Sequence, residues 1–73
     1  FRKKAEEELS SLREKWAWET YKVAKFYEKN EEYLSALLYY QEVKKKFPDT
    51  KWGRASENKI KWLKELGYSL PSS

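Results

Sequence analysis

The chain has 73 residues and a net charge of +4, and it contains neither cysteine nor histidine. This length permits one small domain, and without cysteine there is no disulfide framework, thiolate nucleophile or zinc-finger ligand set. The chain also lacks a glycine-rich phosphate loop and a histidine for proton transfer. We therefore expect no enzyme activity, no cofactor site and no metal site, and the composition favours a binding module.

The first expected element is one long amphipathic helix over about residues 3–29, a stretch without proline or glycine. Its apolar side chains recur at intervals of three, four, seven and four residues, at Leu9, Leu12, Trp16, Val23 and Tyr27. This helical period predicts that they face the core. Trp18 and Phe26 lie off this stripe, so we expect them to form a second contact face.

A turn at residues 30–32 and a second helix over about residues 32–47 are expected next. One side of this helix carries Tyr33, Ala36, Leu37, Tyr40, Val43 and Phe47. Leu34 and Leu38 widen the apolar stripe, which predicts a helix that is covered on both sides. Pro48 ends the element, because proline cannot continue a helix.

A third helix is expected over about residues 51–66, with Asp49 or Thr50 as its N-cap and Gly67 as its left-handed end. Its apolar positions stay close to helical spacing, at Trp52, Ala55, Ile60, Trp62, Leu63 and Leu66. Three helices joined by two short turns predict an all-α fold.

Residues 23–48 keep the spacing of one tetratricopeptide (TPR) helical hairpin. Small Ala24 and Ala36 are twelve residues apart, at the points where the two antiparallel helices should approach most closely. The other expected packing residues are Val23, Tyr27, Tyr33, Tyr40, Val43 and Pro48. The predicted fold is thus a TPR-like hairpin with a long first helix and a third flanking helix.

Such repeats bury their apolar faces against neighbouring repeats, and usually about three are needed for stability. We therefore expect residues 1–67 to be a TPR-type module from a longer solenoid, followed by an irregular tail at residues 68–73. Self-association of this piece is a second way to cover its apolar faces. No run is long and apolar enough to predict a membrane span.

The four tryptophans exceed what one small hairpin can bury, and tryptophan is enriched where interfaces concentrate their binding energy. Trp16 belongs to the first stripe and is expected in the core. At least one of Trp18, Trp52 and Trp62 is expected to lie against another chain or a missing repeat.

A basic cluster surrounds the second turn and consists of Lys44, Lys45, Lys46, Lys51 and Arg54. With Trp52 beside it, this cluster leaves open a surface for nucleic acid or an anionic membrane. The chain also holds twelve acidic residues, and cations in the last turn of a helix complement its dipole. We therefore interpret the cluster as the solvent-exposed end of the second helix and expect no nucleic-acid partner.

The chain resembles the outer-membrane assembly lipoprotein family BamD, also called YfiO or ComL, and in particular its fourth TPR. The similarity covers about residues 5–66 and is carried by residues 12–17 and 19–27, by Tyr33 and Ala36, and by the Phe-Pro-Asp-Thr run at residues 47–50. The long lead-in and the Pro-Asp-Thr ending are not demanded by a generic TPR hairpin.

The resemblance implies a non-catalytic role in β-barrel assembly at the periplasmic face of the outer membrane, with a lipid anchor upstream of this piece. In that family the C-terminal repeats dock the barrel insertase BamA through its membrane-proximal POTRA domain. The resemblance implies an insertase contact at Tyr39, but the chain departs from the family there, because many members have a polar residue and an arginine in place of Leu38 and Tyr39. The candidate partner interface is Trp18, Tyr39, Trp52, Arg54 and Trp62. A generic TPR adaptor with an unrelated peptide partner is the alternative function.

Overall fold

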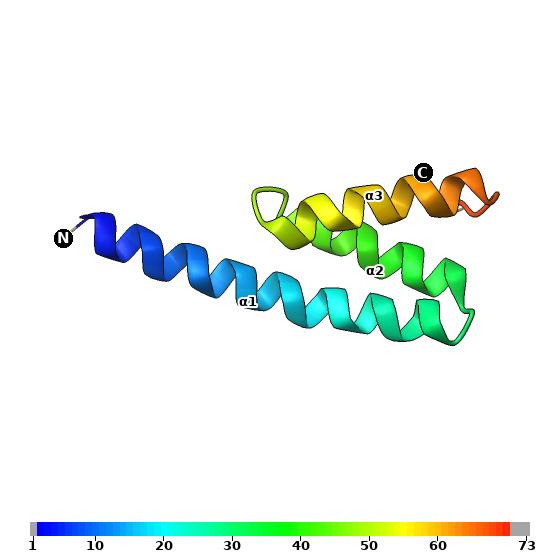
Figure 1. The fold of residues 1–73 in the computed structure, drawn as a ribbon, viewed down its shortest axis with the longest axis horizontal. Helices are drawn as coiled ribbons and strands as arrows, with labels where there is room; N and C mark the ends of the chain where they lie inside the picture. Colours follow the sequence, from blue (N-terminus) through cyan, green and yellow to red (C-terminus); the bar gives the residue numbers. More distant parts are fainter. Residues whose placement is uncertain (1, 71–73) are drawn as a thin grey trace.

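The computed structural model describes residues 2–70, with side chains from residue 10 onward. These residues form three helices, α1 (Arg2–Lys29), α2 (Tyr33–Lys46) and α3 (Lys51–Glu65). The helices fold back on one another in sequence, and the first turns of α1 project past the turn that joins α2 to α3 (Figure 1). The predicted all-α fold is confirmed, and every predicted helix end lies within one residue of the observed one.

The core lies where small side chains let α1 and α2 approach. Ala17 and Ala24 of α1 and Ala36 of α2 have no exposed surface, and the edge of the Tyr21 ring meets the fully buried Tyr40 ring at 5.3 Å between centres. The remaining core side chains are Leu37 and Val43 of α2 and Ile60 and Leu63 of α3. A core built on alanines and tyrosines keeps the helix axes close.

One carboxylate joins all three helices at the far end of α1. Glu28 accepts a hydrogen bond of 2.8 Å from the hydroxyl of Tyr40 in α2, and the ammonium of Lys59 in α3 lies 3.2 Å from the same oxygen. Burial and the neighbouring carboxylate raise the pKa of Tyr40, and burial raises the pKa of Tyr21. Both hydroxyls therefore keep their protons at neutral pH, and Tyr40 stays a donor.

The structure corrects the predicted orientation of α1. Trp16 was expected in the core but is 50% exposed, and Leu12 and Val23 of the same stripe are 44% and 38% exposed. The side chain of Leu9 lies outside the described part of the chain. The inward face instead carries Ala17, Tyr21 and Ala24. The close contact with α2 is made by Ala17 and Ala24, and the large apolar residues Leu12, Trp16 and Val23 of the predicted stripe are left on the outer face.

Helix α2 is also less enclosed than predicted. It contacts α1 on one side and α3 on the other, as predicted, but Leu34 and Leu38, which were expected to widen the covered stripe, are 51% and 49% exposed. Tyr39 stacks on Tyr27 of α1, whereas the ammonium of Lys44 lies 4.0 Å from the carboxylate of Glu57 in α3. Two neighbouring helices occupy only part of the circumference of α2.

The turn between α2 and α3 confirms Thr50, one of the two predicted N-caps, and adds a constraint at Gly53 that the sequence analysis missed. Thr50 is the N-cap of α3, and its hydroxyl accepts a hydrogen bond of 3.0 Å from the Gly53 N–H and donates one of 2.7 Å to the Phe47 carbonyl. A Cβ atom added at Gly53 would lie 2.0 Å from that same carbonyl oxygen. Glycine is required here because two backbone segments nearly touch.

The end of α3 agrees with the prediction. Gly67 has a φ of 101°, and the N–H groups of Gly67 and Tyr68 donate to the carbonyls of Lys64 and Leu63, each at 3.0 Å. Tyr68 and Leu70 follow without helical structure and pack against the core. The tail was predicted to be irregular; its residues 71–73 lie outside the described part of the chain.

We predict that Gly53→Ala destabilises the chain, although alanine usually gains about 1 kcal/mol over glycine inside a helix. The new Cβ has to displace the Phe47 carbonyl, and overpacking of this kind costs about 2–3 kcal/mol. Urea unfolding followed by far-UV circular dichroism measures the change. The control is Asn58→Ala at an exposed site of α3, which should leave stability unchanged or slightly raised. Equal stability of the two variants would contradict the argument.

Candidate docking surface

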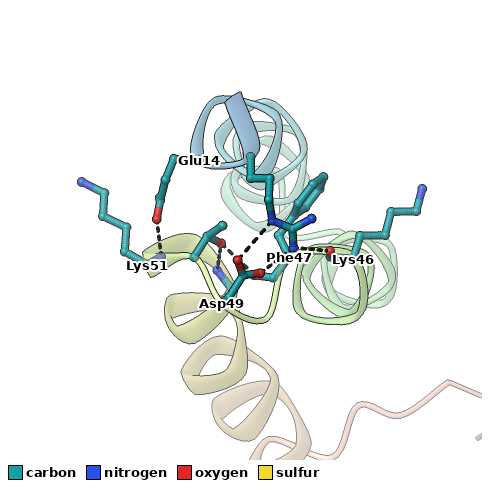
Figure 2. A network of polar contacts seen from close by, with 8 residues as sticks. Glu14, Lys46, Phe47, Asp49 and Lys51 are labelled. Atoms are coloured by element: carbon teal, nitrogen blue, oxygen red, sulfur yellow. Dashed lines mark hydrogen bonds and ion pairs between the residues drawn. The ribbon is translucent and has the colours of Figure 1, made fainter. Parts of the chain in front are cut away.

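Helix α1 holds the turn between α2 and α3 from one side (Figure 2). The guanidinium of Arg13 donates to both carboxylate oxygens of Asp49 and, at 3.1 Å, to the carbonyl of Lys46, and it lies 5.3 Å from the centre of the Phe47 ring. We call this set, Arg13 with Lys46, Phe47 and Asp49, the corner network. It ties the end of α2 to α1.

The next residue of α1 fixes the beginning of α3. Glu14 accepts a hydrogen bond of 3.0 Å from the backbone N–H of Lys51 (Figure 2). A carboxylate is favourable at this point, because the first N–H groups of a helix lack partners within it and carry partial positive charge. Arg13 and Glu14 together decide where α3 starts relative to α1.

The corner network changes the titration of its carboxylate. The hydrogen bond from Arg13 lowers the pKa of Asp49, and the positive charge of Arg54 acts in the same direction. Asp49 in turn raises the pKa of Arg13. Both groups are therefore charged over the neutral range.

With α3 held in this position, aromatic rings of α1 and α3 meet. The ring centres of Trp18 in α1 and Trp52 in α3 are 4.5 Å apart, and Tyr21 lies 5.0 Å from Trp52. Such pairs contribute beyond the area they bury. Residues 34 positions apart in the sequence thus form one aromatic group.

Each of three tryptophans has a lysine ammonium above its ring. The distances to the ring centres are 4.7 Å for Lys51 and Trp52, 5.3 Å for Lys59 and Trp62, and 5.9 Å for Lys22 and Trp18. All three lie within the range of a cation–π contact. We call these six residues the tryptophan-lysine face.

An open hollow of about 460 Å³ adjoins this face between α1 and the start of α3. It is lined by Ser11, Glu14, Lys15, Trp18, Lys51 and Trp52. Glu14 Oε2 is buried and has no hydrogen-bond partner among the described residues. Apolar rings with cations at the rim and a carboxylate at one side suit a contact with protein side chains.

The described residues provide little for other chemistry. They contain no group of three histidine, cysteine, aspartate or glutamate side chains that could hold a metal ion. Within residues 2–70, no helix is long and apolar enough to cross a membrane.

A family model described as YfiO, outer membrane lipoprotein, matches residues 1–69. The chain belongs to the YfiO family. The resemblance to BamD predicted from the sequence is thereby confirmed, and membership places the chain among lipoproteins of outer membrane assembly. Comparisons with curated proteins and with solved structures gave no significant match.

The predicted interface residues of this YfiO-family chain do not form one patch. Trp18 and Trp52 lie together, and Trp62, 38% exposed, continues along α3 and meets the edge of Tyr33 at 6.1 Å. Tyr39 stacks on Tyr27 of α1 at 5.4 Å, in a separate ring contact. Arg54 is exposed on α3.

The residues predicted to pack in the TPR hairpin are also distributed unequally. Ala24, Ala36, Tyr40 and Val43 are buried. Tyr27 and Tyr33 are half-buried, and Pro48 is exposed just beyond the end of α2. The position of Val23 differs from the prediction, because its side chain lies on the outer face of α1 rather than in the hairpin contact.

Two lysines of the tryptophan-lysine face, Lys22 and Lys59, were missed in the sequence, whereas Lys51 was named there in the basic cluster beside Trp52. Lys22 follows Trp18 by four residues and Lys59 precedes Trp62 by three, spacings that place side chains on one helix face. This signal was present in the sequence of the YfiO-family chain. For Lys51 the sequence showed only that it is adjacent to Trp52, and its place above the Trp52 ring depends on the start of α3.

We predict that Asp49→Asn lowers stability at neutral pH, because it removes the charged partner of Arg13. The pKa of Asp49 is lowered in the folded chain, so its contribution is complete above the ordinary aspartate pKa of about 3.9 and is lost as pH falls further. The difference between the two proteins in urea unfolding should therefore disappear in acid.

The matched control is Glu65→Gln, which removes an exposed carboxylate that makes no ion pair within the described residues. It should leave the free energy of unfolding nearly unchanged at neutral pH. A difference between wild type and Asp49→Asn that stayed constant from neutral pH into acid would show that the corner network does not act through its charge.

Proposed function

We propose that this chain is a non-catalytic docking module that binds the membrane-proximal POTRA domain of the barrel insertase BamA. Membership of the YfiO family supports an assembly role at the periplasmic face of the outer membrane, with a lipid anchor supplied upstream of this piece. The observation that carries the proposal is the tryptophan-lysine face, in which each of three rings has an ammonium above it.

Such a face combines two contributions to binding. Tryptophan rings offer large, rigid apolar area and are frequent among residues that dominate interface energetics. The lysines keep positive charge at the rim, where it speeds encounter with an acidic partner surface and selects orientation. A protein surface that presents apolar residues beside carboxylates would complement both.

The corner network supports this role by organising the face before binding. Trp52 belongs to the first turn of α3, and Glu14 and Arg13 hold that turn against α1. An interface that is already ordered loses less conformational entropy when the partner binds. Rigid placement of Trp52 beside Trp18 thus favours affinity.

The test is a titration of the chain with the POTRA domain of the insertase from the same organism, at low and moderate salt, followed by tryptophan emission. We expect saturable binding that survives moderate salt, and Trp62→Ala should weaken it about tenfold if the ring is an interface anchor. Arg54→Ala should mainly lower the association rate, since exposed charges act on encounter.

Phe26→Ala is the control, because it removes another exposed aromatic side chain that lies outside the tryptophan-lysine face. It should bind the POTRA domain like the wild type. No binding by any variant, with circular dichroism showing a folded chain, would reject the insertase as partner and leave the generic TPR adaptor. Affinity that collapses with salt and extends to DNA or anionic vesicles would instead indicate an unspecific basic surface.

A further inference from the structure

The outer face of α1 carries a regular apolar seam. Leu12, Trp16, Val23 and Phe26 are 44%, 50%, 38% and 62% exposed, and the opposite face of the helix is the one buried in the bundle. With Glu19 between Trp16 and Val23, successive positions are separated by four, three, four and three residues. This alternation is the spacing with which one helix packs along another in a coiled coil. We call these five residues the outer seam.

One flank of the outer seam is uniformly basic. Lys15, Lys22 and Lys29 are exposed and follow one another at intervals of seven residues, so they form a row beside the seam. The opposite flank has no free charge, because Arg13 is bound to Asp49 and Tyr27 is stacked on Tyr39. The charge offered to a helix lying on the seam is therefore positive.

We propose that the outer seam binds an amphipathic helix of a partner protein that carries acidic residues along the flank facing Lys15, Lys22 and Lys29. Residues that flank a coiled-coil seam form the interhelical ion pairs that decide which helices associate. Insertion of apolar side chains between Trp16, Val23 and Phe26 supplies the affinity, and the lysine row selects the partner. The five residues of the outer seam lie outside the tryptophan-lysine face, which shares only Lys22 with the lysine row, and the proposal does not depend on insertase binding.

A second copy of this chain does not meet the requirement. In an antiparallel pair of α1 helices the lysine flanks would face each other, and Glu19 would lie against apolar seam residues of the copy. In a parallel pair the lysine row would face the flank of Arg13, Thr20 and Tyr27, which has no acidic residue. Neither arrangement pairs the lysines with carboxylates.

Glu19 adds a condition on the register of the partner. It lies in the middle of the seam and its carboxylate is 3.2 Å from the ammonium of Lys22, with both side chains about half exposed. A polar residue at one seam position usually fixes register at a cost in stability. The partner helix should therefore place a lysine, arginine or amide side chain opposite Glu19.

The length of the seam defines the length of the partner. The span from Leu12 to Phe26 covers fourteen residue steps, or about 21 Å at 1.5 Å per residue. Two heptads of the partner match it. This is long enough for a small number of anchoring contacts and short enough for reversible binding.

The test uses three fluorescently labelled synthetic peptides of about three heptads with leucine at the seam positions. The first has glutamate at both flanks, the second has lysine there, and the third is a scramble of the first. Anisotropy titration of the chain should give binding of the glutamate peptide about tenfold or more tighter than of the lysine peptide or the scramble.

Variants of the chain localise the binding. Trp16→Ala and Phe26→Ala should each weaken binding of the glutamate peptide about tenfold, as removal of an interface anchor does. Lys15→Glu combined with Lys29→Glu should abolish the preference for the glutamate peptide; Lys22 is kept because it pairs with Glu19 and lies above Trp18. Trp62→Ala, outside the seam, should bind like the wild type.

Three results would overturn the proposal. Equal affinity for the glutamate peptide and its scramble would reduce the effect to net charge. An unchanged preference in the double lysine variant would remove the lysine row from recognition. Sedimentation equilibrium showing a dimer that Trp16→Ala dissociates would assign the seam to a second copy. Circular dichroism of each variant establishes that it is folded, and the exposed positions chosen leave the core intact.

Discussion

The contact between α1 and the turn joining α2 to α3 governs the arrangement of the molecule. Arg13 binds the carboxylate of Asp49 and the last carbonyl of α2, and Glu14 binds the first N–H of α3. Gly53 permits the backbone of α3 to pass against the Phe47 carbonyl. These local restraints direct α3 alongside the bundle, and the pairing of Trp18 with Trp52 depends on that direction.

Among the described side chains, α1 contributes no large aliphatic residue to the core of this small helical module. Ala17, Ala24 and Tyr21 make the inner face of α1, and the tyrosine rings fill the space that the alanines leave. The hydroxyl of Tyr40 donates to Glu28, which also faces Lys59, so the polar end of this buried ring has a hydrogen-bond partner. The large apolar side chains of α1 are then available outside.

Two surfaces of different character result. The tryptophan-lysine face is built from α1 and α3 and requires the tertiary fold, since its rings come from distant parts of the chain. The outer seam belongs to α1 alone and has the geometry of a single helix. We propose one partner for the folded face and a second for the long helix.

The sequence by itself determined the helices, their ends and the family. Local signals suffice for these features, because helical periodicity, Pro48, the Thr50 cap and Gly67 act over a few residues each. It did not determine which face of α1 is buried. The stripe containing Trp16 and Val23 has a helical period and high hydrophobicity, yet close packing with α2 selected the alanine face.

Only the tertiary structure decided the composition of the candidate docking surface. Trp18 and Trp52 were both selected from the sequence, but their contact, the separation of Tyr39 from them, and the position of Lys51 depend on where α3 begins. The need for glycine at position 53 was equally invisible, since it arises from the Phe47 carbonyl on the preceding turn. Periodicity in the sequence predicts that a helix has an apolar face. Whether that face or another one is buried depends on how closely the neighbouring helices pack.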